Sequence, residues 1–180
     1  TSSQVVQAVP TGINSALVLI SAGSKTSAVT QSFNSVFTTD YRNYKIIFSQ
    51  VTAGNNEEVY MRVGTSGTPD SGNNYRYNRI TNPSSGILAS SGATVLTNMV
   101  IIPNTGLANN YVEMSISSPF ETERTIINAQ TLGTRTSNSP ENFFSLLMVD
   151  TATSYTDLSI TASSGSAFTM NFAIYGYVKS

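Results

Sequence analysis

The stretch that decides the fold is FTMNFAIY, residues 168–175, in which apolar and polar side chains alternate almost strictly. Because successive side chains of a β-strand point to opposite faces, this pattern predicts a strand with one buried face. Residues 44–48 (YKIIF) and 59–63 (VYMRV) show the same alternation in part. The three stretches therefore favour a sheet that packs one of its faces against a core.

The rest of the chain repeats this pattern, and clusters of Gly, Asn, Ser, Pro or Asp separate one candidate strand from the next. No long window keeps apolar residues at the spacing of an amphipathic helix. The sequence thus predicts an all-β fold of antiparallel strands, arranged as a sandwich or a barrel. The predicted strands cover residues 16–21, 28–33, 44–51, 58–63, 75–80, 94–102, 111–117, 124–130, 143–149, 158–161 and 168–178.

The length of 180 residues is suited to one domain with one core. We expect a single β-sandwich domain at residues 16–180, preceded by an extended arm at residues 1–15 that contains no charged residue. Two segments rich in Gly, Pro, Ser and Asn, residues 65–74 and 81–92, are predicted to be long loops at the ends of the sheets. In sandwich proteins such loops commonly carry the function.

Composition excludes several classes of function. The formal net charge is −1 and charged residues make up 11% of the chain, so no basic surface is available to bind nucleic acid. The apolar runs are far shorter than the ~20 residues of a membrane-spanning helix. The chain contains no His and no Cys, which removes the usual catalytic triads and the usual zinc ligands. We therefore expect a non-enzymatic protein with no metal and no cofactor.

Carboxylates are the remaining candidates for catalysis or for calcium binding. Glu57 and Glu58 are adjacent in a predicted strand and point to opposite faces, so they cannot flank one glycosidic bond. Glu121 and Glu123 could share a face, but their sequence context predicts a solvated loop. The loop at residues 70–74 (DSGNN) offers oxygen ligands without the spacing or the closing Glu of a calcium loop, and a plain turn is the favoured interpretation.

The candidate ligand-binding residues are Tyr75, Arg76, Tyr77 and Arg79, in the sequence YRYNR at residues 75–79. Alternation places Tyr75, Tyr77 and Arg79 on one face of the strand and Arg76 on the other. Aromatic rings and guanidinium groups can stack on sugars and bind hydroxyl or acidic groups. The favoured alternative is structural: both Tyr rings cap the core with their hydroxyls in water, and the Arg side chains pair with Asp70, Glu57 or Glu58.

The segment DYRNY at residues 40–44 precedes a predicted strand and is typical of a corner. We expect Tyr41 or Tyr44 to send its hydroxyl back to the backbone there, as in other sandwiches.

The first half of the chain resembles virion proteins of tailed bacteriophages. The resemblance lies in residues 17–20 (LVLI), in the pattern V-F-x-x-x-Y-x-x-Y-x-I at residues 36–46, in YMR at residues 60–62, and in the Gly/Ser/Asn-rich loop at residues 66–77 that ends in Tyr. The resemblance implies a jelly-roll-like β-sandwich on the outer surface of the particle, assembled in the bacterial cytoplasm and often as a homotrimer. It brings no catalytic motif.

Three functions follow as alternatives. The first is a tail fibre or appendage domain that recognises the host surface, plausibly a cell-surface glycan, and contacts other virion proteins. The second is a capsid decoration protein that uses the N-terminal arm to bridge shell subunits. The third is a carbohydrate-binding module, for which the predicted strand with Tyr75 and Tyr77 would have to be accessible.

Overall fold

The computed structural model describes residues 17–53, 57–82, 89–105, 109–134 and 140–179. Within these ranges it contains thirteen strands and no helix, and the strands pair antiparallel in two sheets that pack against each other. The prediction of an all-β antiparallel sandwich is therefore confirmed. The predicted arm at residues 1–15 lies outside the described residues.

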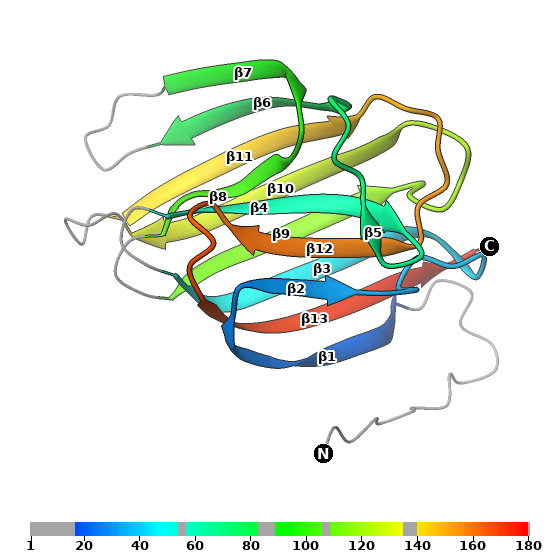
Figure 1. Cartoon of the computed structure of the whole chain (residues 1–180), viewed down its shortest axis with the longest axis horizontal. Coiled ribbons are helices and arrows are strands. Elements are labelled where there is room, and N and C mark those ends of the chain that lie inside the picture. The colour runs from blue at the N-terminus through cyan, green and yellow to red at the C-terminus, as the bar shows by residue number, and fades with distance from the viewer. Residues whose placement is uncertain (1–16, 54–56, 83–88, 106–108, 135–139, 180) are drawn as a thin grey trace.

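The larger sheet has eight strands and the smaller sheet has five. Figure 1 shows the smaller sheet lying across the middle of the larger one, with β1 at one edge of the larger sheet and β7 at the other. In spatial order the larger sheet contains β1 (Leu17–Ala28), β13 (Phe168–Val178), β3 (Tyr41–Thr52), β9 (Asn110–Ser117), β10 (Thr125–Thr134), β11 (Pro140–Val149), β6 (Tyr75–Asn82) and β7 (Ala89–Leu96). The smaller sheet contains β2 (Thr30–Phe33), β12 (Asp157–Ala162), β4 (Glu57–Thr65) and β5 (Thr68–Pro69), with β8 (Met99–Thr105) paired to β4.

The pairing follows the wrapping of a jelly roll. The first strand, β1, pairs with the last, β13, and the second, β2, pairs with the next to last, β12. Inward along the chain, β3 pairs with β9 and β4 with β8. The hairpins β6–β7 and β10–β11 are additions to this eight-stranded core, and they extend the larger sheet beyond β9.

The core lies between the sheets and is built by the alternating residues of the facing strands. Tyr44, Ile46 and Phe48 of β3 are at most 1% exposed, whereas Lys45 and Ile47 between them are partly exposed. On β4 the residues Val59, Met61 and Val63 are all buried. Both predicted alternations thus mark the inward faces, and burial of these apolar side chains stabilises the sandwich.

Several predicted bounds differ from the structure by a few residues, and three predictions differ in kind. The single strand predicted at residues 94–102 is two strands, β7 and β8, because the chain bends at residues 97–98 and passes from one sheet to the other. The loop predicted at residues 81–92 is partly strand, since β6 reaches Asn82 and β7 begins at Ala89. The first strand runs on to Ala28, through a Gly/Ser/Lys stretch, because it pairs along the edge of β13.

The predicted long loop at residues 65–74 begins with a tight hairpin. Thr65 of β4 pairs with Thr68 of β5, which leaves a two-residue turn of Ser66 and Gly67. Both turn residues have positive φ, 53° and 80°. This is the backbone of a type I′ turn, whose twist matches that of the flanking strands.

The predicted corner at residues 40–44 is confirmed, with Tyr44 as the anchoring residue. Its hydroxyl accepts the Thr38 N–H at 2.8 Å and lies 3.2 Å from the Thr38 carbonyl oxygen, to which it donates. The Tyr44 ring is fully buried and packs edge-on against Phe37 and Tyr41. The corner therefore fixes how the chain enters β3.

Candidate binding site

The predicted binding residues of β6 lie on two faces of the strand. Tyr75 is fully buried, Tyr77 and Arg79 are partly buried, and the outward-facing Asn78 is exposed. The predicted alternation is therefore correct, and it directs Tyr75, Tyr77 and Arg79 toward the interior. A ligand on the surface cannot stack on the Tyr75 ring.

The Arg side chains of β6 are engaged within the chain. Arg76 forms an ion pair with Asp150, in which Nη2 and Oδ2 are 2.5 Å apart, and its Nε donates to the same oxygen at 2.6 Å. The predicted partners of Arg76 were Asp70, Glu57 or Glu58, so the structure corrects the pairing. The Arg79 guanidinium carbon lies 5.4 Å from the ring centre of Tyr77 and 6.0 Å from that of Phe143, which is the geometry of cation–π contacts.

Tyr75 has a structural role that points to a neighbouring hollow. Its hydroxyl donates to the carbonyl oxygen of Asp70 at 2.8 Å, rather than lying in water. The Asp70 N–H in turn donates to the carbonyl oxygen of Val63 at 2.8 Å. Tyr75 and β4 thus hold the loop at residues 70–74 in place.

This loop forms one side of an open hollow of about 430 Å³ at one end of the sandwich. The other side is the segment between β11 and β12, and two backbone hydrogen bonds join the sides: Asp150 N–H to the Asn74 carbonyl at 2.7 Å, and Thr156 N–H to the Gly64 carbonyl at 2.9 Å. Most lining side chains are uncharged and polar. The lining consists of Gly64, Thr65, Thr68, Pro69, Asp70, Ser71, Gly72, Asn74, Thr151, Thr153 and Tyr155.

Asp70 is the charged group of the hollow. Its Oδ1 accepts the Gly72 N–H at 2.8 Å, and its Oδ2 accepts the Tyr155 hydroxyl at 2.9 Å and the Asn74 amide at 3.1 Å. Burial by itself would raise the pKa of Asp70, but these hydrogen bonds outweigh burial and hold the pKa below its usual value. The carboxylate is therefore ionised and fixed in orientation at neutral pH.

Asp70 fixes the direction in which the neighbouring hydroxyl groups donate their hydrogen bonds. Because the Tyr155 hydroxyl donates to Asp70, the Thr151 hydroxyl, 2.7 Å away, must donate to Tyr155. Tyr155 itself is 2% exposed, and burial is the main reason that its pKa is raised. By contrast, Ser71 and Thr153 are exposed, so their hydroxyls are open to a ligand.

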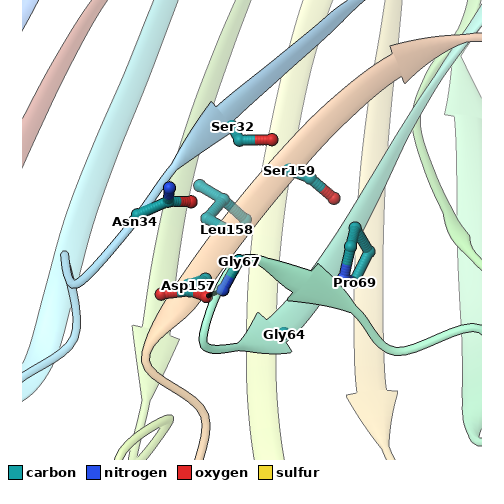
Figure 2. Close-up of a pocket in the computed structure, with 8 residues that line it drawn as sticks. All are labelled: Ser32, Asn34, Gly64, Gly67, Pro69, Asp157, Leu158 and Ser159. Atoms are coloured by element: carbon teal, nitrogen blue, oxygen red, sulfur yellow. Dashed lines mark hydrogen bonds between the residues drawn. The ribbon is translucent and has the colours of Figure 1, made fainter.

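A second, much smaller pocket lies beside the β4–β5 hairpin and serves the fold. Figure 2 shows Asp157 at the start of β12 beside Gly67 of the hairpin turn, with Asn34 and Ser32 across from them. The volume of about 10 Å³ holds one water at most. Asp157 is 5% exposed and accepts the N–H groups of Gly67 and Ser35 and the hydroxyl of Thr156. This carboxylate ties β12 to the hairpin and to the end of β2.

The other acidic candidates are occupied by contacts on the surface. Glu121 and Glu123 lie in the turn before β10, as predicted, and pair with Lys179 and Arg42, each at 3.1 Å. Glu58 accepts the Tyr60 hydroxyl at 2.8 Å, and Glu57 accepts from Ser163 and Ser164. No group of three acidic residues that could hold a metal ion occurs among the described residues. Within the same residues, no helix could span a membrane.

The class of protein that these strands define is an antiparallel, jelly-roll-like β-sandwich. No protein-family model matches the chain, and a search of curated proteins also finds no match. The resemblance to virion proteins of tailed phages therefore rests on the sequence motifs of the first half alone.

Sequence reasoning pointed to one side of the hollow and missed the other. The loop at residues 70–74 stood out by its Asp, Gly and Asn residues, but it was interpreted as a plain turn. Thr151, Thr153 and Tyr155 carry no local signal, because threonines and tyrosines are common throughout this chain. Only the fold, which brings the end of β11 next to the loop before β6, joins them.

Proposed function

We propose that this chain is a non-enzymatic structural protein on the outer surface of a tailed-bacteriophage virion, where it forms a tail fibre or appendage domain that binds the host surface. The sequence resemblance supplies the virion setting and favours a homotrimer. The observation that carries the binding role is the hollow beside Asp70, in which polar loops meet at one end of the sandwich. In sandwich proteins such loop ends are frequent binding sites.

The chemistry of the hollow favours a neutral, hydroxyl-rich ligand such as a cell-surface glycan. Exposed hydroxyls at Thr68, Ser71 and Thr153 can both donate and accept hydrogen bonds, and the Thr65 hydroxyl, which donates to the Ser154 carbonyl oxygen, can still accept one. The ionised Asp70 disfavours an acidic sugar by charge repulsion. Since the Tyr155 ring is buried, a sugar cannot stack on it, and we expect the ligand to bind through hydrogen bonds. Each such contact is weak, and several copies of the protein on one particle would raise the overall affinity.

A blocking substitution in the hollow tests the binding role. Thr153→Arg places a bulky side chain at the exposed rim, and we expect it to abolish binding of the labelled, purified protein to host cells. The matched control is Ser164→Arg, because Ser164 is exposed in the turn after β12, at the other end of that strand. Cell binding that survives Thr153→Arg, or that is lost equally in Ser164→Arg, would remove the hollow from consideration.

The virion setting has a separate test. Gold-labelled antibody against this protein should label the tail or its fibres on purified particles viewed by electron microscopy. Label over the head would instead assign the protein to capsid decoration. Particles without any label would contradict the virion setting and leave a free-standing carbohydrate-binding module.

A further inference from the structure

Strand β11 is apolar on both of its faces. Phe143, Leu147 and Val149 point inward and are at most 4% exposed. The outward residues Phe144 and Leu146 are 44% and 57% exposed. A strand of an antiparallel sheet that faces water on one side normally carries polar residues there. The composition of β11 is that of a strand covered on both faces.

The neighbouring strands extend this apolar surface. Ile80 of β6 lies directly opposite Phe144, and Ile126 of β10 lies opposite Met148. Ile80 and Ile126 are each 48% exposed. We call Ile80, Ile126, Phe144, Leu146 and Met148 the outer patch; it forms one continuous surface on the side of the larger sheet that faces away from the smaller sheet.

The outer patch lies on the two hairpins that are added to the jelly roll. The strands β6, β10 and β11 are not among the eight that pair as first with last, second with next to last, and so on. No described residue packs over the patch, and monomeric proteins rarely expose a continuous apolar surface of this kind without an interaction partner.

We propose that the outer patch is the contact between copies of this chain. The exposed residues between its apolar side chains, Asn78, Asn128 and Gln130, are uncharged. An amide group both donates and accepts hydrogen bonds, so the same surface can meet a second copy without unpaired charges. At the margin, Arg76 and Arg124 both pair with Asp150, and Glu113 pairs with Lys45. These charges are therefore engaged within the chain, which favours a neutral partner surface.

The outer face of β6, β10 and β11 is large enough to form the centre of such a contact. Strands about 4.8 Å apart and at most ten residues long, about 34 Å, present at most on the order of 500 Å² in projection, and the outer patch is the apolar middle of this face. A standard interface buries about 800 Å² on each partner, with an apolar centre and a polar rim. The polar residues of the adjoining strand β9, such as Ser115 and Ser117, supply the rim on one side. The proposal does not depend on the virion setting.

The experiment measures the mass of the purified full chain by light scattering during gel filtration, over a range of concentrations. We expect a mass above the 19.2 kDa of one chain. Leu146→Arg should weaken self-association roughly 100-fold or more, since the new charge is desolvated without a partner. The control is Leu19→Arg on β1, because Leu19 is 46% exposed on the distant edge strand of the same sheet. Circular dichroism and thermal unfolding confirm that each variant is folded.

Thiol labelling gives a second test of the interface. It uses a Cys substitution, which disturbs the structure less than Leu146→Arg does. The natural chain has no Cys, so Leu146→Cys introduces the only thiol. Its reaction with a maleimide should be slow in the assembled protein and fast after dilution, while Leu19→Cys reacts fast at both concentrations. A protein that is monomeric throughout, or an oligomer unchanged by Leu146→Arg, would overturn the proposal. Protection of the thiol in a monomeric protein would also overturn the proposal, because another part of the same chain would then cover the outer patch. Protection that occurs in virions alone would overturn it as well, because another virion protein would then cover the patch.

Discussion

Tyr44 is a residue whose hydroxyl holds a turn of the chain rather than a ligand. The hydroxyl accepts the Thr38 N–H and donates to a backbone carbonyl, and the ring is buried among Phe37 and Tyr41. The same principle applies to Tyr75, whose hydroxyl supports the loop at Asp70. Both tyrosines thus position backbone, Tyr44 at the corner before β3 and Tyr75 at the loop beside the hollow.

Replacing Tyr44 by Phe tests the strength of the corner. The change keeps the ring but leaves the Thr38 N–H without its acceptor, so we expect a loss of about 1–3 kcal/mol in the free energy of unfolding. Urea titration followed by circular dichroism measures it. Tyr41→Phe is the matched control, because the Tyr41 hydroxyl has no hydrogen-bond partner in the described part of the chain. Equal losses in the two variants would contradict the role of the Tyr44 hydroxyl.

Asp157 makes the stability of the fold dependent on pH. Burial alone would raise the pKa of Asp157, but hydrogen bonds from Ser35, Gly67 and Thr156 hold it below its ordinary value. A pKa that is lower in the folded state than in the unfolded chain adds stability above the unfolded value of about 3.9. This contribution disappears as the pH falls from there through the folded-state pKa.

We therefore expect Asp157→Asn to lose about 2 kcal/mol of unfolding free energy at pH 7, with the difference from the natural protein shrinking below about pH 4. Chemical denaturation at a series of pH values gives this profile. Glu123→Gln should change stability by less than about 1 kcal/mol, because its ion pair with Arg42 is exposed. A loss in Asp157→Asn that stays constant down to pH 2 would contradict the electrostatic explanation.

At the scale of elements, the β4–β5 hairpin depends on a close approach of two backbones. A Cβ added to Gly64 would overlap the carbonyl oxygen of Thr68, which is backbone and cannot move aside. The hairpin also lines the hollow beside Asp70. The glycine at this position therefore supports both the fold and the candidate site.

Gly64→Ala should open the hairpin, with an expected loss of about 2–4 kcal/mol from overpacking and displaced backbone. Gly67→Ala serves as a milder comparison. No atom lies within 4 Å of the added Cβ, so the only cost is the backbone strain of an Ala residue at a φ of 80°. We expect it to lose about 1 kcal/mol. Thermal unfolding of both variants ranks them, and a Gly67→Ala protein less stable than Gly64→Ala would contradict the steric argument.

Strands were predictable from the sequence where apolar and polar side chains alternate clearly. They were uncertain where residues that disfavour strands are held in a strand by pairing with a neighbour. The facing strands β3 and β4 alternate visibly, and their inward residues were correctly identified. The second half of β1 is rich in Gly, Ser and Lys, and it is a strand because β13 supplies a partner along its length. A turn near Ser66 and Gly67 was predictable from their residue types. Its exact position was not, because similar turn-forming residues continue through residues 65–74.

The candidate site was less predictable than the fold. The strand with Tyr75 and Arg79 stood out because it combines tyrosines with arginines and charged residues are rare in this chain. Tyr75, Tyr77 and Arg79, however, all lie on the inward face of β6. The hollow beside Asp70 joins residues about eighty positions apart, such as Ser71 and Thr153. Their proximity follows from the order of the strands in the sheets, which local sequence patterns do not reveal.

At the scale of the whole molecule, the surface of the sandwich carries very few charges. Charged residues are 11% of the chain, and most of those described lie in ion pairs or accept hydrogen bonds. Hydroxyl and amide side chains are frequent on the rest of the described surface, which also contains the apolar outer patch. We expect a surface with so few charges to be only weakly affected by salt.

The pairing of the first strand with the last has a consequence for how the protein is made. On the ribosome β1 emerges long before its partner β13, because most of the sandwich lies between them in the sequence. The closing contact spans some 150 residues, so loop-closure entropy makes folding slow, on the scale of milliseconds to seconds. During that interval the edge of β1 is open to strands of neighbouring nascent chains. We expect Gly23, Ser24 and Lys25 of β1 to weaken such pairing and so to limit aggregation of the nascent chain, because Gly and Lys are unfavourable in exposed edge strands.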